Sequence, residues 1–257
     1  MTAVTPHSHQ NLGPIHPPKV DKRAIKPSVA KHIQIPVKDP LDHEAPAIIH
    51  EPRSYNAKQA NGAAVILVSG AGGGVSGPSG IYPSLADKLA LLISIPCIRL
   101  DYRQPAQTEF CTADIIASLN YLSEQYSSSR FVVVGWSFGA SPCITAAAQE
   151  DRISGVATVG AQLAKTSGIS QLPPRPLLLL HGSGDRVLSA SCSQTLYELY
   201  GNAGQRDFKL FPGGDHGLTG HAPEAEGVIL AFAARTLGFE KLLDHETMDQ
   251  ARGDLVE

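Results

Sequence analysis

The chain alternates between runs of apolar residues and segments with helical spacing. HIQIPV at 32–37 alternates apolar and polar positions, and PAIIHEP at 46–52 is a second short run; both are typical of antiparallel strands at a sheet edge. Six further runs are mostly apolar throughout, which predicts strands buried on both faces: 63–70, 95–102, 131–137, 155–161, 176–182 and, more weakly, 207–213.

Helical patterns lie between these runs. Apolar residues recur at the spacing that places them on one face of a helix in 82–92, 112–126, 189–201 and 223–238. Thr112 is expected to be the N-cap of the second helix, and Gly201 to form a left-handed C-cap after the third. Strands that alternate with helices predict an α/β fold with a mainly parallel sheet.

The two ends of the chain differ in composition from its middle. Residues 1–30 are rich in proline, histidine and lysine without periodic hydrophobicity, and we expect a flexible arm there. Three histidines in this arm could bind a metal, but no carboxylate or cysteine completes a ligand set, so we expect no metal site at His7, His9 or His16. Residues 31–240 would form one domain, followed by a charged tail at 241–257.

Composition narrows the possible partners. With 257 residues, 42% of them hydrophobic, the chain is suited to one globular core, and a net charge of −3 offers no basic surface to nucleic acid. No apolar run approaches the roughly 18 residues of a membrane span, and the N-terminus lacks the apolar core of a signal peptide. We therefore expect a cytoplasmic protein with no membrane partner. Reduced thiols are expected at Cys97, Cys111, Cys143 and Cys192, which form no CxxC pair.

A glycine-rich stretch, LVSGAGGGVSGPSG at 67–80, allows two interpretations. Gly72, Gly74 and Gly77 fit the G-x-G-x-x-G fingerprint of dinucleotide-binding folds, and Asp101 ends the next strand, where such a fold holds the ribose. However, that fingerprint normally follows the first strand of the fold, and here two strand-like runs precede it. An NAD(P)-binding oxidoreductase is therefore the less favoured hypothesis.

The other interpretation depends on a G-x-S-x-G motif, GWSFG at 135–139. It lies between an apolar strand and the helix-compatible segment SPCITAAAQ, where a sharp turn would expose Ser137. Asp185 follows the strand at 176–182, and His216 follows the next strand. The chain order Ser, Asp, His at strand ends is that of a nucleophile-elbow hydrolase.

Three neighbouring residues compete for these assignments. His221 could replace His216, but His216 follows directly after the PGGD turn at the strand end. Asp215 points the other way along the backbone from His216, which leaves Asp185 as the acid. His181 is expected to shape the loop that carries Asp185.

With these motifs the chain resembles the α/β-hydrolase superfamily over residues 30–240, and within it the compact dienelactone-hydrolase-like branch. The resemblance is carried by SGAGGG at 69–74, GWSFG, HGSGD at 181–185 and GGDHG at 213–217. It implies a three-layer fold with an eight-stranded, mainly parallel sheet and helices on both faces. Only residues 162–175 separate two strands where many relatives insert a lid, so no large lid is expected. Dienelactone hydrolases use a cysteine nucleophile, and Ser137 departs from that pattern.

The resemblance also implies roles for individual residues. Ser137 would attack an acyl carbon, His216 would act as the base and Asp185 would orient the imidazole. Backbone N–H groups of Phe138 and Ala71, with Gly72 as the next candidate, would stabilise the oxyanion. No cofactor is implied.

Three side chains are candidates for lining the substrate site: Tyr82, Trp136 and Arg103. Core packing is the alternative for Trp136, and a surface position or pairing with an aspartate is the alternative for Arg103. Asp114 is expected to support a helix N-terminus electrostatically.

The expected activity is hydrolysis of an ester, lactone or thioester of a small to medium molecule through an acyl-serine, by a monomer or homodimer. The same triad could instead perform C–C bond hydrolysis, acyl transfer or a cyclisation, because a fold does not fix a reaction. A non-catalytic binding module is a further alternative.

Overall fold

The computed structural model of the protein describes residues 28–244 and residue 247. The first strand begins at Val29, within the segment predicted to be an arm. Residues 1–27, with His7, His9 and His16, lie outside the described residues, as does most of the predicted tail.

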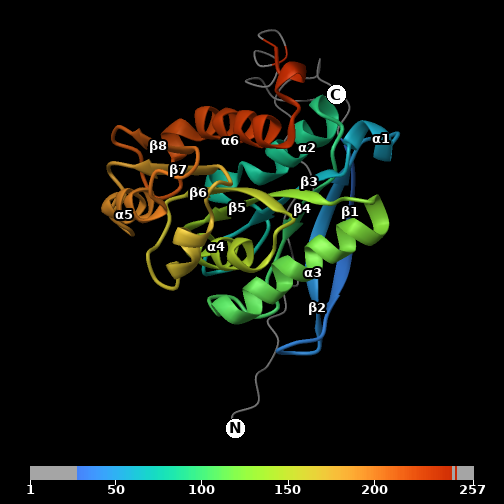
Figure 1. Ribbon diagram of the computed structural model, residues 1–257, viewed down its shortest axis with the longest axis horizontal. Coiled ribbons are helices and arrows are strands. Elements are labelled where there is room, and N and C mark those ends of the chain that lie inside the picture. Colours follow the sequence, from blue (N-terminus) through green and yellow to red (C-terminus); the bar gives the residue numbers. More distant parts are fainter. Residues whose placement is uncertain (1–27, 245–246, 248–257) are drawn as a thin grey trace.

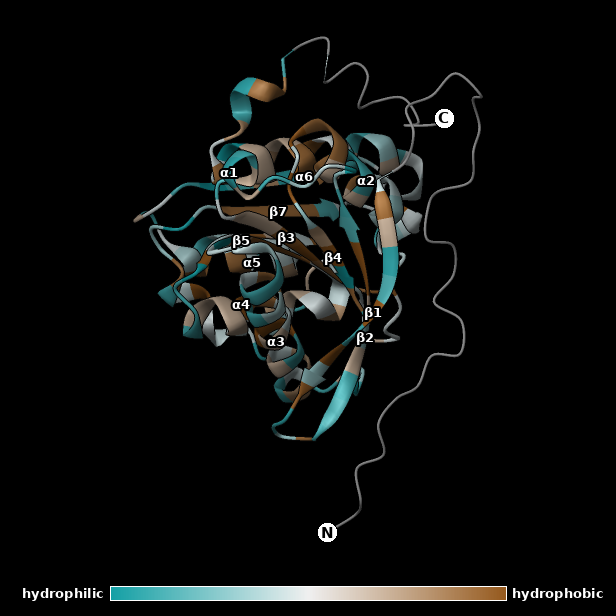
Figure 2. Ribbon diagram, turned by 90° about the vertical axis from the view of Figure 1, so that its right-hand side faces the viewer, coloured by the Kyte–Doolittle hydropathy of each residue, from teal (hydrophilic) through white to brown (hydrophobic). Residues whose placement is uncertain are grey.

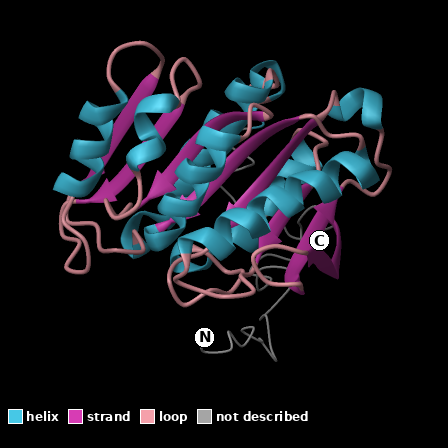
Figure 3. Ribbon diagram, turned by 60° about the horizontal axis from the view of Figure 1, so that its bottom comes forward, coloured by secondary structure: helices cyan, strands magenta, loops and turns pink. Residues whose placement is uncertain are grey.

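One eight-stranded sheet forms the centre of the protein (Figures 1 and 3). Its strands lie in the order β1-β2-β4-β3-β5-β6-β7-β8. The pairs β1–β2 and β2–β4 are antiparallel and the other pairs are parallel, which agrees with the predicted edge strands and mainly parallel sheet. The strands are β1 Val29–Val37, β2 His43–Glu51, β3 Ala63–Val68, β4 Cys97–Leu100, β5 Arg130–Trp136, β6 Ile153–Val159, β7 Leu177–Gly182 and β8 Arg206–Phe211.

Helices cover both faces of the sheet and complete three layers (Figure 2). On one face lie α3 Thr108–Tyr126, α4 Ala140–Gln149 and α5 Ser191–Tyr200. On the other lie α2 Tyr82–Leu92 and α6 Ala222–Leu237. A single turn, α1 Ala57–Ala60, precedes β3, and short 3-10 turns occupy Pro78–Gly80, Ser137–Gly139, Ser167–Gln171, Thr219–His221 and Glu240–Leu242. Only the turn at Ser167–Gln171 lies between β6 and β7, so that connection carries no lid domain.

Strand β3 shows how the apolar runs build this core. All six of its side chains are buried, because both faces of the strand are covered by helices. Ala64, Ile66 and Val68 contribute to the core beneath α3 and α4, whereas the alternate residues contribute to the core beneath α2 and α6. Complete burial of a residue such as Ile66 stabilises the fold by roughly 1.5–3 kcal/mol.

Two predicted helix caps differ from the structure. Helix α3 begins at Thr108 with Gln107 in the cap position, so the predicted N-cap at Thr112 is wrong. The helix starts about one turn earlier because Cys111, in its first turn, packs into the core beneath it. Gly201 does end α5 with a positive φ of 76°, but its ψ of −164° is not the left-handed helical conformation that we predicted.

The residues Arg103 and Asp114 form a fully buried ion pair between the end of β4 and the middle of α3. Arg103 also donates to the carbonyl oxygens of Val37 and Leu41, and therefore fixes the hairpin between β1 and β2. The structure therefore confirms the alternative interpretation of Arg103, pairing with an aspartate, whereas its substrate-lining role and the helix-terminal role of Asp114 are wrong. Each of the two charged side chains can be buried because the other neutralises its charge.

The turn between β5 and α4 brings backbone into contact with backbone. A Cβ atom added at Gly139 would lie 2.5 Å from the carbonyl oxygen of Ser69, and one at Gly135 would overlap the carbonyl group of Gly139. Ser137, between the two glycines, has a φ of 57°, in the left-handed region that non-glycine residues rarely adopt. Glycine is therefore required on both sides of Ser137.

Replacement of Gly135 by alanine should destabilise the protein. The added methyl group has no space, and overpacking of this kind costs about 1–3 kcal/mol or more. The free energy of unfolding in urea measures the effect. Gly227→Ala is the matched control: it lies within α6, nothing lies within 4 Å of its added Cβ, and better helix propensity should stabilise it by up to about 1 kcal/mol. Equal stability of Gly135→Ala and the wild type would contradict the steric argument.

Removal of the carboxylate by Asp114→Ala should destabilise the fold by about 3–5 kcal/mol, because Arg103 would remain buried without its counter-charge. The exposed pair of Arg235 and Asp207, with an N–O distance of 3.1 Å and side chains 47% and 48% exposed, provides the comparison. Asp207→Ala should cost less than about 1 kcal/mol. Urea unfolding of both variants tests the difference, and similar losses would refute it.

Candidate active site

The structure brings Ser137, His216 and Asp185 together at one edge of the sheet. His216 Nε2 lies 2.9 Å from Ser137 Oγ, and His216 Nδ1 lies 2.7 Å from Asp185 Oδ2. The three residues follow β5, β8 and β7, whose carboxyl ends meet at the same edge because these strands are parallel. An ionised Asp185 accepts a hydrogen bond from Nδ1–H, which leaves the Nε2 lone pair free to accept a hydrogen bond from the Ser137 hydroxyl.

Asp185 is held by its own loop as well as by His216. Its Oδ1 accepts hydrogen bonds from the backbone N–H groups of Val187 at 2.8 Å and Leu188 at 2.9 Å. Burial by itself raises the pKa of this carboxyl, but the hydrogen bonds from His216, Leu188 and Val187 outweigh burial, so the pKa lies below its ordinary value. Asp185 therefore remains an anion at neutral pH.

His181 shapes the Asp185 loop from behind, as expected. Its Nε2 lies 3.0 Å from the carbonyl oxygen of Leu188 and 3.2 Å from Asp185 Oδ2, while its Nδ1 lies 2.7 Å from Ser193 Oγ on α5. The Leu188 carbonyl can only accept, so Nε2 carries the proton and Nδ1 accepts from Ser193. The fully buried ring therefore ties this loop to α5.

The competing residues have other partners. His221 Nε2 lies 3.1 Å from the carbonyl oxygen of Pro212, and its ring packs against Phe211. Asp215 accepts a hydrogen bond of 2.7 Å from the backbone N–H of Thr219. His216, rather than His221, is therefore the histidine that reaches Ser137.

Trp136 fixes His216 from the side. Its Nε1–H donates to the carbonyl oxygen of His216 at 3.1 Å, and the two rings lie 5.7 Å apart. This contact gives the half-buried indole a positioning role that the sequence pattern did not reveal. Tyr82, in contrast, is fully buried, and its hydroxyl donates to the carbonyl oxygen of Val68, so its predicted place in the substrate site is wrong.

The glycine-rich loop lies directly beside Ser137. A Cβ atom added at Gly70 would lie 3.4 Å from Ser137 Cβ. A hydrogen bond from Gly73 N–H to Gly70 O closes a turn with Ala71 and Gly72 at its apex. Within the described part of the chain, the N–H groups of Ala71 and Gly72 donate to no protein acceptor. The loop therefore offers unused donors next to the hydroxyl.

Asp101 argues against the dinucleotide-binding hypothesis. Its carboxylate is buried, and Oδ1 accepts the N–H groups of Gly74 at 2.7 Å and Tyr102 at 2.8 Å. The acid that would hold a ribose is therefore committed to the backbone of the loop itself.

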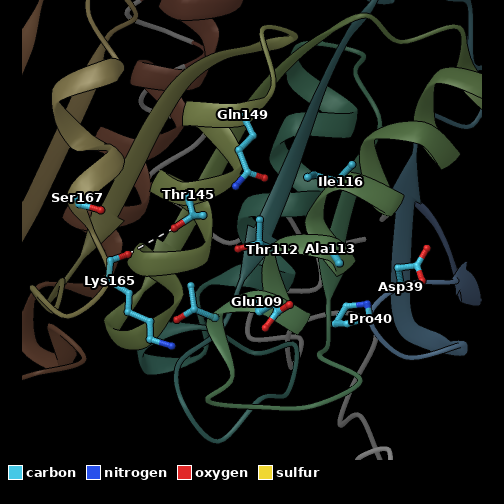
Figure 4. A pocket seen from close by; sticks show the side chains of 11 residues that line it. Asp39, Pro40, Glu109, Thr112, Ala113, Ile116, Thr145, Gln149, Lys165 and Ser167 are labelled. Carbon is cyan, nitrogen blue, oxygen red and sulfur yellow. Dashed lines mark hydrogen bonds between the residues drawn. The ribbon is translucent and has the colours of Figure 1, made fainter.

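A cavity of about 570 Å³ lies outside this site, between α3, α4, the β1–β2 hairpin and the segment after β6 (Figure 4). None of Ser137, Asp185 and His216 lines it. Its walls are formed by Asp39, Pro40, Thr108, Glu109, Thr112, Ala113, Ile116, Thr145, Gln149, Lys165 and Ser167.

Three further properties concern possible cofactors and compartments. Among the described residues, no three His, Cys, Asp or Glu side chains are grouped so that they could hold a metal ion. The thiols of Cys97, Cys111 and Cys143 are buried and that of Cys192 is partly exposed; all four are free. No helix in residues 28–244 has the length and apolar character needed to cross a membrane.

Comparisons with known proteins agree with the observed fold. Solved structures that resemble the chain include an esterase domain of a Rhodothermus marinus protein (TM-score 0.65, 17% identity, covering 82% of this chain and 100% of that one). Another is XC6422 of Xanthomonas campestris, a serine hydrolase without a lid (TM-score 0.62, 15% identity, covering 82% of this chain and 96% of that one). A third is a puromycin-hydrolysing peptidase of Mycobacterium tuberculosis (TM-score 0.63, 17% identity, covering 83% of this chain and 40% of that one). No curated protein sequence matches the chain significantly. The family profile described as the alpha/beta hydrolase fold matches residues 63–206, more than half of the sequence, and the chain therefore belongs to the α/β hydrolase family.

Proposed function

We propose that the protein is a serine hydrolase that cleaves an ester, lactone or thioester of a small to medium molecule through an acyl-serine. The observation that carries this proposal is the continuous hydrogen-bonded chain from Ser137 Oγ through His216 to Asp185. A serine hydroxyl is a weak nucleophile unless a neighbouring base removes its proton, and His216 is within reach to do so.

The reaction follows from the positions of these groups. Ser137 Oγ attacks the acyl carbon while its proton moves to His216 Nε2, and the carbonyl electron pair moves to the oxygen. The ionised Asp185 stabilises the resulting imidazolium. When the tetrahedral intermediate collapses, His216 returns the proton to the departing alcohol or thiol. Water then attacks the acyl-serine by the same route, which releases the acid and restores Ser137.

The negative oxygen of the intermediate needs donors that are already in place. We assign this role to the backbone N–H groups of Phe138 and Ala71, with Gly72 as the alternative to Ala71. Phe138 follows the nucleophile directly, and Ala71 is at the apex of the turn beside Ser137. Small residues in this turn keep side chains out of the approach to the oxyanion.

Two features support a small acyl substrate. The β6–β7 connection has no lid domain to enclose a long chain, and structural neighbours include an esterase domain and a lidless serine hydrolase. A peptidase among the neighbours illustrates that the same fold serves several acyl bonds. The proposed substrate class therefore rests on the triad and on the absence of a lid domain between β6 and β7.

The replacement Ser137→Ala should abolish both hydrolysis of p-nitrophenyl acetate and labelling by a fluorophosphonate probe, because the only assigned nucleophile is removed. Intact-mass and peptide mass spectrometry locate the label in the wild type. Ser141→Ala, one turn further along α4, is the control and should retain labelling. A label on another residue, or activity that persists in Ser137→Ala, would refute the proposed function.

The replacement Ala71→Pro should lower kcat/KM by a factor of about 10²–10³, the usual effect of losing one oxyanion donor. Proline has no N–H, and Ala71 occupies the second position of the turn, where proline is well tolerated. Ala71→Ser retains the N–H group and should stay within about threefold of the wild type. Equal kinetics of the proline and serine variants would exclude this amide as a donor.

A further inference from the structure

A buried arginine donates a hydrogen bond to the backbone of the glycine-rich loop. Arg99 is in β4 and fully buried, and its Nη1–H donates to the carbonyl oxygen of Val75 at 3.0 Å. Val75 lies three residues beyond Gly72 in the same loop. Burial lowers the pKa of Arg99 to about 10, so the side chain remains charged at neutral pH.

A chain of polar side chains holds the guanidinium in place. Arg99 Nε–H donates to His50 Nε2 at 3.0 Å, and His50 Nδ1 lies 2.8 Å from Asp87 Oδ1 on α2. Because arginine can only donate, His50 Nε2 must accept, and the histidine proton is on Nδ1, facing Asp87. The hydroxyl of Ser28 also donates to Asp87 Oδ1, at 2.6 Å. This Ser, His and Asp set is fully enclosed, so it can orient Arg99 but cannot reach a substrate.

A second side chain, that of Asp101 directly after β4, holds the neighbouring residue of the loop. Asp101 Oδ1 accepts a hydrogen bond from the N–H of Gly74, whose φ is 86°. Asp101 therefore holds Gly74, and Arg99 holds the next residue, Val75. Arg99 and Asp101 are two residues apart, at the end of β4 and just beyond it, and both contact the glycine-rich loop. The amides of Ala71 and Gly72 therefore project from a loop that is fixed at both Gly74 and Val75.

We propose that Arg99, oriented by His50 and Asp87, and Asp101 are positioning residues that set the oxyanion donors of the glycine-rich loop against Ser137. This inference rests on the proposed function. Neither residue touches the substrate. They act through the backbone between Gly72 and Val75, which sets the position of the oxyanion donors. They therefore stabilise the transition state, where the oxyanion develops, rather than the initial binding of the substrate.

Arg103 provides a matched control within the same segment. Like Arg99, it is fully buried and donates to the backbone, although its carboxylate partner, Asp114, contacts it directly rather than through a histidine. However, those carbonyls belong to the β1–β2 hairpin instead of the glycine-rich loop. Arg99→Lys and Arg103→Lys therefore remove similar contacts from the core, but only the former loosens the loop.

The experiment compares the wild type, Arg99→Lys and Arg103→Lys as full-length chains. Fluorophosphonate titration first counts the reactive Ser137 in each preparation, so that misfolded protein is excluded. Turnover of p-nitrophenyl acetate and inhibition by a trifluoromethyl ketone are then measured per titrated site. Ser137 Oγ adds to the carbonyl carbon of the ketone while its proton moves to His216 Nε2, and the carbonyl electron pair becomes a hemiketal oxyanion, so the Ki of the ketone reports on the oxyanion donors.

For Arg99→Lys we expect kcat to fall by about tenfold or more while KM stays within about threefold, because the contact acts on the transition state. The Ki of the ketone should rise by a similar factor. Arg103→Lys should lower the melting temperature but leave kcat and Ki within about twofold of the wild type. Unchanged kcat and Ki in Arg99→Lys, or equal changes in both variants, would overturn the inference.

A milder variant keeps the test decisive if Arg99→Lys does not fold. Asp101→Asn retains the shape and an acceptor oxygen but loses the charge, and should lower kcat about threefold or more with the same rise in Ki. Wild-type kinetics in a folded Asp101→Asn would then overturn the inference. Absence of labelling in the wild type would overturn the proposed function and this inference together, whereas a labelled wild type with an unaffected Arg99→Lys overturns only the latter.

Discussion

The site depends on backbone packed against backbone where β5 turns into α4. Gly139 lies so close to the carbonyl oxygen of Ser69 that no side chain fits between them, and Gly135 lies equally close to Gly139. This packing forces Ser137 into a left-handed conformation, which costs of order 1–3 kcal/mol. The fully buried centre of β5 and the packed face of α4 sustain that cost. The same contact places Gly70, and with it the glycine-rich loop, beside the hydroxyl.

Contacts of the same kind bring the other two loops together. A Cβ at Gly182 would overlap the carbonyl of Gly214, and one at Gly184 would lie 2.9 Å from the carbonyl of Gly213. The loop after β7 and the loop after β8 are therefore joined through glycines, and Asp185 comes within hydrogen-bond distance of His216. The glycines of HGSGD and GGDHG thus allow the backbones of the two loops to lie close together, and this proximity places Asp185 beside His216.

The parts of the structure that could be predicted from the sequence are those with local signals. Six mostly apolar runs, one alternating segment and one short apolar run indicated the eight strands, and strand ends followed by Ser137, Asp185 and His216 indicated which residues meet. The two wrong helix caps are local errors, whereas the wrong site assignments concern side chains whose partners lie elsewhere in the chain. Arg103 pairs with Asp114 and donates to a hairpin more than sixty residues away, and no local pattern shows that a charged residue after a strand will point inward. Trp136 is similar, because its partner is the backbone of His216.

Strand β4 shows why such buried charges are placed in this part of the fold. Arg99, Asp101 and Arg103 alternate along the strand and its extension, and each is bound to backbone groups of a segment that has no strand partner at that point. Removal of a charge from water costs several kcal/mol even in a relaxed protein, and an apolar side chain would fill the same volume more favourably. An apolar side chain, however, cannot select one conformation of a glycine-rich loop, because glycine offers no side chain to pack against. Charged hydrogen bonds to the backbone of Gly74 and Val75 provide that selection, so the order of the loop depends on groups that are costly to bury.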